Sequence, residues 1–95
     1  MKFVNCARYV SDREKINSVR PAHRIYVKGL MEQGRLITGG PFTDDSGALL
    51  IYEAETIKEV NEMIADDPYT TDGVFVSCEV KPWECVGINK SLFPD

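Results

Sequence analysis

Three side chains are the best candidates for acid–base chemistry: the only histidine, His23, and the adjacent carboxylates Asp66 and Asp67. An imidazole gains and loses a proton near neutral pH, so a half-buried histidine is a natural proton carrier. A carboxylate beside it would fix its tautomer and stabilise its protonated form. These residues therefore suggest proton transfer by His23, with one of the two aspartates as its partner.

His23 lies on the apolar face of a predicted helix. The apolar residues around it recur at the three- and four-residue spacing of one helical face: Ile16, Val19, Tyr26 or Val27, and Leu30. Pro21 precedes the histidine by two residues, and Arg20 and Arg24 flank the apolar face. The alternative interpretation is structural: a histidine that fills a gap in the core, with both ring nitrogens bonded to backbone groups.

Asp66 and Asp67 fall in the predicted last turn of a second helix, directly before Pro68. Carboxylates there face the negative end of the helix dipole, which is unfavourable. Residues that break a local rule in this way are candidates for function. The alternative is an ordinary Asp-Pro turn with solvated carboxylates, and Arg20 is a further candidate partner for one of them.

The segment Gly39-Gly40-Pro41 ends a predicted short strand over residues 35–38. Glycines have no Cβ, so their backbone N–H groups can approach a ligand oxygen closely. The segment opens no helix and lacks the spacing of a dinucleotide-binding loop. Its structural alternative is a bulge and turn at the strand end. Asp44 and Asp45 are interpreted as turn residues.

The remaining pattern predicts the elements that position these residues. A strand covers residues 2–10, and a capping box from Ser11 to Glu14 opens a helix that runs to about Gln33, kinked or broken before Pro21. Further strands cover 48–54 and 74–80, and between them Thr56 caps a helix that Pro68 stops. The order is βαββαβ.

Two helices cannot cover both faces of a four-stranded sheet. Yet residues 48–52 (ALLIY) are apolar on both faces, as in a strand buried on two sides. Either a second copy of the chain covers the far face, or that face holds a partly wet pocket. A homodimer is the simpler expectation for a chain of 95 residues, whose own core is limited.

Composition narrows the function classes. The formal net charge of −4 argues against nucleic acid and against an anionic membrane surface. Three cysteines without a CxxC pair indicate free thiols in a reducing compartment and no metal site. Cys6 and Cys78 are expected to be packing residues, and Trp83 to close the sheet end or a subunit contact. No signal peptide or membrane span is evident, so we expect a cytoplasmic protein.

Four blocks in order resemble the YciI-like family: residues 20–23 (RPAH), 34–41 (GRLITGGP), 66–69 (DDPY) with Gly73-Val74, and 80–83 (VKPW). The resemblance spans residues 2–84, which defines a predicted domain over 1–84 and leaves 85–95 as a tail. It implies an α+β, ferredoxin-like fold with a four-stranded antiparallel sheet. It also implies a dimeric α+β barrel related to the muconolactone isomerase architecture, with higher oligomers as an alternative.

The same resemblance implies an active site built on His23 and on Asp67, the aspartate before Pro68. Family members with assigned chemistry are similar to dehydrochlorinases or proton-transfer enzymes for small aromatic-derived compounds. We therefore expect a cofactor-independent lyase or isomerase, with Arg20 binding an anionic substrate and Gly39, Gly40 and Pro41 lining the site. The alternatives are a non-catalytic module that binds a small ligand and an accessory subunit.

Overall fold

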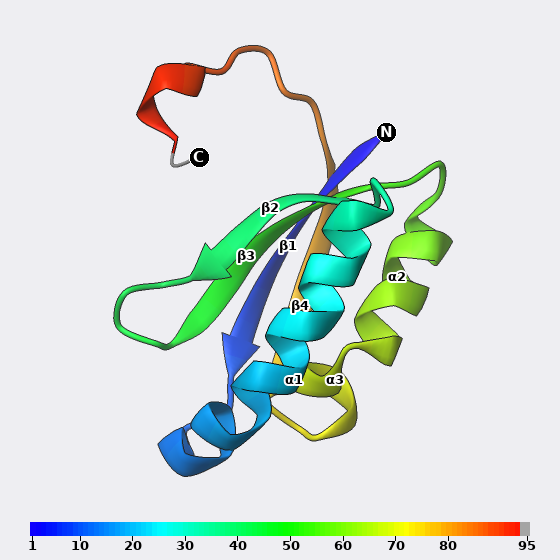
Figure 1. Cartoon of the computed structure of the whole chain (residues 1–95). Coiled ribbons are helices and arrows are strands. Elements are labelled where there is room, and N and C mark those ends of the chain that lie inside the picture. Colours follow the sequence, from blue (N-terminus) through cyan, green and yellow to red (C-terminus); the bar gives the residue numbers. More distant parts are fainter. Residues whose placement is uncertain (94–95) are drawn as a thin grey trace.

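The computed structural model describes residues 1–93, which alternate strands and helices around one sheet (Figure 1). The elements are β1 (Lys2–Tyr9), α1 (Arg13–Glu32), β2 (Leu36–Pro41), β3 (Gly47–Glu53), α2 (Ile57–Asp66), α3 (Pro68–Thr71), β4 (Phe75–Trp83) and a 3₁₀ turn at Lys90–Leu92. The strands pair antiparallel in the order β2-β3-β1-β4. This order confirms the predicted α+β, ferredoxin-like sheet.

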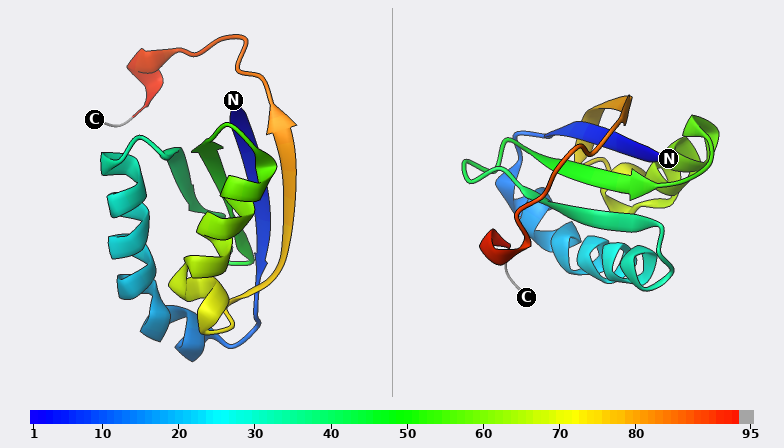
Figure 2. Two further views of the ribbon diagram at one scale, coloured as in Figure 1. Left: turned by 90° about the vertical axis from the view of Figure 1, so that its right-hand side faces the viewer. Right: turned by 90° about the horizontal axis from the view of Figure 1, so that it is seen from above.

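Helix α1 begins one residue later than its predicted capping box. Asp12, not Ser11, is the N-cap, and its side chain accepts a hydrogen bond from the Lys15 N–H at 3.2 Å. The helix continues through Pro21 without a break, although this proline has no N–H to bond the Asn17 carbonyl. Its axis changes direction after the first turns, which is the kink expected of an internal proline (Figure 2).

The second helical region contains two helices rather than one. Thr56 caps α2 as predicted and accepts a hydrogen bond from the Glu59 N–H. Pro68 does more than stop α2, because it is the first residue of α3. Proline suits that position, since the first N–H groups of a helix have no partner within it.

Strand β2 is longer than predicted, because Gly39, Gly40 and Pro41 lie within it instead of following it. Gly39 pairs with Leu50, and a Cβ at position 39 would come within 3.1 Å of the Leu49 carbonyl oxygen. Pro41 is tolerated because β2 is an edge strand and the proline is its last residue. Strand β4 continues to Trp83, beyond its predicted end at residue 80. Pro82 is tolerated within it because β4 is the other edge strand of the sheet.

Both long helices pack on one face of the sheet (Figure 2). Residues of the sheet and helices that form this core are almost fully buried: Phe3, Ile16, Leu50, Tyr52, Val60, Met63, Tyr69 and Val74. On the other face Leu49 and Trp83 remain 40% and 42% exposed, and within residues 1–93 no helix covers them. Among these residues, none of the helices combines the length and apolarity needed to cross a membrane.

Within a single chain, Cys6 and Cys78 are not the core packing residues that the sequence suggested, since both are exposed free thiols, as is Cys85. Cys6 pairs with Leu49 and Glu79 and so belongs to the sheet face that carries no helix. Cys78 lies on the edge strand β4. Strand alternation and the edge position, rather than the apolar character of cysteine, decide their exposure.

Buried phenols make the fold sensitive to alkali. Burial raises the pKa of Tyr9 to about 12 and also raises the pKa values of Tyr52 and Tyr26. Above about pH 10 the unfolded chain therefore loses phenolic protons that the folded chain keeps. For Tyr9 the free energy of unfolding therefore falls by about 1.4 kcal/mol per pH unit between about pH 10 and about pH 12.

We therefore expect the urea midpoint of unfolding to drop between about pH 10 and about pH 12. Tyr9→Phe should reduce this slope, because phenylalanine has no proton to lose. A midpoint that stays constant over this range in the unmodified chain would contradict the prediction.

Candidate active site

The fold brings His23, from α1, against Asp67, from the junction of α2 and α3. Nδ1 of the imidazole lies 2.7 Å from Oδ1 of the carboxylate. The two side chains are 12% and 1% exposed, respectively. A carboxylate accepts hydrogen bonds, so in the neutral imidazole Nδ1 carries the proton and Nε2 is left as the basic nitrogen. Nε2 makes no hydrogen bond to any residue from 1 to 93.

Asp67 is the C-cap of α2, at the helix end that the sequence indicated, and it is at the same time the N-cap of the next helix, α3. The last residue of α2 is Asp66, which is exposed. At the start of α3, Oδ1 of Asp67 accepts a hydrogen bond from the Tyr69 N–H at 2.9 Å. A negative charge is favoured at a helix N-terminus, so the local structure supports the carboxylate. Oδ1 of Asp67 thus accepts hydrogen bonds from both the Tyr69 N–H and Nδ1 of His23.

Tyr69 fixes the plane of the imidazole. The rings of His23 and Tyr69 are stacked, with centroids 3.8 Å apart and an interplanar angle of 4°. Phe75 from β4 approaches the same imidazole edge-on, at 6.0 Å. Tyr69 is completely buried, so the surface that carries the imidazole is rigid. Packing and the Asp67 hydrogen bond together hold His23 in one orientation.

Arg20 lies one turn before His23 on α1 and pairs with neither Asp66 nor Asp67. Its Nη2 donates to Oδ1 of Asp45 at 2.6 Å, and its Nε donates to the Tyr69 hydroxyl at 3.0 Å. The hydrogen bonds to Tyr69 and Asp45 raise the pKa of Arg20. Asp45 belongs to the β2–β3 turn and has a φ of 60°, a left-handed conformation that aspartate tolerates. This turn residue therefore has a second role as the charge partner of Arg20.

A pocket of about 300 Å³ opens beside the imidazole, between α1 and strands β2 and β3. It is lined by Tyr9, Arg20, His23, Arg24, Val27, Lys28, Met31, Gly39, Gly40, Pro41, Ala48, Leu50 and Tyr69. Every site residue expected from the sequence contributes to this lining except Asp67, which lies behind His23.

Sequence reasoning assigned no role in the site to Arg24, Lys28, Tyr69 or Tyr9. The first two follow Arg20 at intervals of four residues on α1, a spacing that places all three cations along one side of a helix. This spacing could have identified Arg24 and Lys28 as candidate site residues from the sequence alone. Tyr9 and Tyr69 carry no comparable signal, because only the packing of β1 and α3 brings them to His23.

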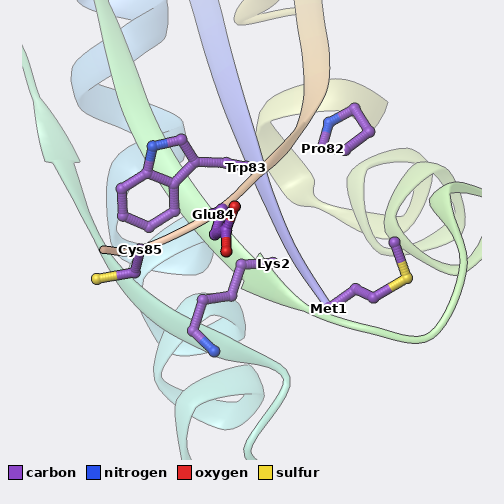
Figure 3. Close-up of a pocket in the computed structure, with 6 residues that line it drawn as sticks. All are labelled: Met1, Lys2, Pro82, Trp83, Glu84 and Cys85. Carbon is purple, nitrogen blue, oxygen red and sulfur yellow. The ribbon is translucent and has the colours of Figure 1, made fainter. Parts of the chain in front are cut away.

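A larger hollow, of about 500 Å³, lies where β1 begins and β4 ends. It is lined by Met1, Lys2, Pro82, Trp83, Glu84 and Cys85 (Figure 3). None of its lining residues belongs to the pocket at His23, and none is an imidazole. The smaller pocket is therefore the candidate active site.

Comparison with known proteins identifies the family. Residues 1–84 match the YCII-related domain. The protein YciI of Escherichia coli is 36% identical, over 77% of this chain and 85% of its own length. An uncharacterised protein of Haemophilus influenzae is 32% identical over the same shares.

Two solved structures share the fold. The 5-chloro-2-hydroxyhydroquinone dehydrochlorinase TftG of Burkholderia phenoliruptrix, solved with 2,5-dihydroxybenzoquinone, superposes with a TM-score of 0.78 at 29% identity. The alignment covers 88% of this chain and 94% of TftG. A protein of Arabidopsis thaliana, at 14% identity and a TM-score of 0.50 over 93% of this chain and 97% of its own, shows the fold alone. On this evidence the chain belongs to the family of YCII-related proteins.

Proposed function

We propose that this protein is a cofactor-independent enzyme that transfers a proton on a small metabolite, by elimination or isomerisation. The observation that carries the proposal is the 2.7 Å contact between His23 Nδ1 and Asp67 Oδ1, on an imidazole that lines a pocket. A buried carboxylate, a fixed imidazole and an adjoining cavity are the arrangement that general acid–base catalysis requires.

In the proposed mechanism, Asp67 holds the Nδ1 proton and Nε2 of His23 is the base. Nε2 takes a proton from the substrate, and the electron pair of the broken bond forms a new double bond. In an elimination, the leaving group, such as chloride, departs with its own bonding pair. In an isomerisation, the imidazolium returns the proton at another atom. The negative Asp67 stabilises the imidazolium in either case.

The Gly39–Gly40 backbone is proposed to stabilise the negative charge that develops on a substrate oxygen. Both glycines line the pocket opposite α1, and open space surrounds the position that a Cβ of Gly40 would occupy. A ligand oxygen can thus come close to the main chain at this position.

The pocket volume and the TftG likeness suggest a substrate with a single ring. Benzene fits a cavity of about 150 Å³, so the pocket of about 300 Å³ accommodates one ring with several substituents. TftG is a dehydrochlorinase that acts on a chlorinated hydroxyhydroquinone. This supports dehydrochlorination of a hydroxylated aromatic compound as the first reaction to test.

The test is a panel of chlorinated hydroxyaromatics followed by release of chloride, together with unsaturated lactones followed by deuterium exchange from solvent. We expect turnover of at least one compound by the unmodified protein and its loss in His23→Ala. Binding without turnover or exchange across the panel would instead favour the non-catalytic module.

We also propose that a second copy covers the sheet face that carries no helix. A hollow of about 410 Å³ on this face is lined by Val4, Cys6, Leu49, Ile51, Glu79, Lys81, Pro82 and Trp83. Apolar side chains exposed together on one face usually mark a contact surface.

The three free thiols further suggest a cytoplasmic location, where cysteines stay reduced.

Light scattering at micromolar concentration should therefore give the mass of a dimer. Leu49→Asp should shift the mass towards the monomer, because it places a charge in the centre of the proposed contact. Ile25→Asp is the control, since Ile25 is 74% exposed on α1 and lies away from that face. A monomer mass for the unmodified protein would contradict the proposal.

A further inference from the structure

The cations of the pocket differ in whether they are already paired. Arg20 donates to Asp45 and to Tyr69, and the Asp45 carboxylate compensates its charge. The side chains of Arg24 and Lys28 line the same pocket, but neither forms an ion pair or a hydrogen bond with any residue from 1 to 93. Arg20 is therefore a poor candidate for the substrate-binding cation that the sequence suggested, and Arg24 and Lys28 are better ones.

The charge of the pocket is opposite to that of the chain. The protein carries 15 acidic and 11 basic side chains, yet the pocket lining holds three cations and no carboxylate. With Arg20 compensated by Asp45, the charges of Arg24 and Lys28 remain. Walls with one sign of charge raise the local concentration of ligands of the opposite sign.

Helix geometry places the two free cations at a useful distance from the base. Arg24 directly follows His23, and Lys28 lies about 7.5 Å further along α1 than His23, at a rise of about 1.5 Å per residue. Between them the helix presents Val27 to the pocket, and Leu50 and Ala48 supply apolar surface from β3. A ring can thus lie on the apolar surface, with one edge at His23 and an anionic substituent at Lys28 or Arg24.

We propose that Arg24 and Lys28 form an anion-binding pair that selects substrates with a carboxylate or an equivalent anionic group on the ring. This inference rests on the proposed function of the same pocket. In this proposal Arg20 is a positioning residue: it bonds to Tyr69, whose ring stacks on His23. Arg24 and Lys28, one and two turns after Arg20 on α1, contact the ligand.

The test uses two probes of the same shape, meta-hydroxybenzoate and its neutral amide, meta-hydroxybenzamide. His23 is the only histidine, so its imidazole proton signals in an NMR titration report on this pocket without ambiguity. The unmodified protein should bind the benzoate about tenfold more tightly than the amide at low ionic strength, and added salt should reduce that preference.

The double variant Arg24→Gln/Lys28→Gln should bind the two probes with nearly equal affinity. Lys58→Gln is the matched control, because Lys58 is an exposed cation on α2 outside the pocket, and it should keep the preference. A preference that persists in the double variant, or equal affinities in the unmodified protein, would overturn the anion-binding pair alone. If neither probe shifts the His23 signals, the pocket does not bind ring compounds of this kind, and the proposed function is contradicted as well.

Discussion

Replacing Asp67 by asparagine is expected to lower kcat by two or more powers of ten on a substrate found by the chloride-release panel. Asparagine keeps the shape of the side chain, and the Tyr69 N–H, 2.9 Å from Oδ1, favours keeping a carbonyl oxygen at that position. The loss should therefore come from the missing negative charge beside the imidazolium, and not from a rearranged site.

Asp66→Asn is the control, since Asp66 is exposed and outside the pocket lining. It should keep the rate of the unmodified protein. A rate within tenfold of the original in Asp67→Asn would contradict the role of Asp67.

His23→Ala should be at least as damaging as Asp67→Asn, because it removes the base itself. The variant leaves a space between Tyr69 and the Asp67 carboxylate, which the imidazole ring fills at a stacking distance of 3.8 Å. Free imidazole added to the solution should enter this space and restore part of the rate in a saturable manner.

Circular dichroism and light scattering on His23→Ala separate a loss of chemistry from a loss of structure. A variant that folds and turns over substrate at the normal rate would show that His23 only fills the core. A folded but inactive variant that imidazole rescues would support the proposed base.

Much of the fold could be predicted from the sequence because its signals are local. Apolar spacing predicts α1, and Thr56 with Glu59 predicts the start of α2. Boundaries were less predictable where proline is present. The sequence predicted that one strand ends before Gly39 and another at residue 80. Both strands continue, through Pro41 and through Pro82, because β2 and β4 are edge strands, whose outer backbone groups need no partner.

The site shows the same division between local and long-range information. Local signals in the sequence placed His23 on a helix face and Asp67 at the end of α2, but they did not show that Asp67 also caps the start of α3. Nothing local predicted that Asp45, 25 residues from Arg20, would become its charge partner. That contact depends on how the β2–β3 turn meets α1, which is a property of the assembled sheet.

The most direct test of the His23–Asp67 pair as one catalytic unit is a double-mutant cycle on chloride release, with His23→Ala, Asp67→Asn and the combination. Residues that act together are strongly non-additive, because Asp67 has nothing to support once the imidazole is gone. The account predicts that the double variant is little slower than the slower single variant. Losses that multiply across the two substitutions would show that His23 and Asp67 work independently, and would contradict it.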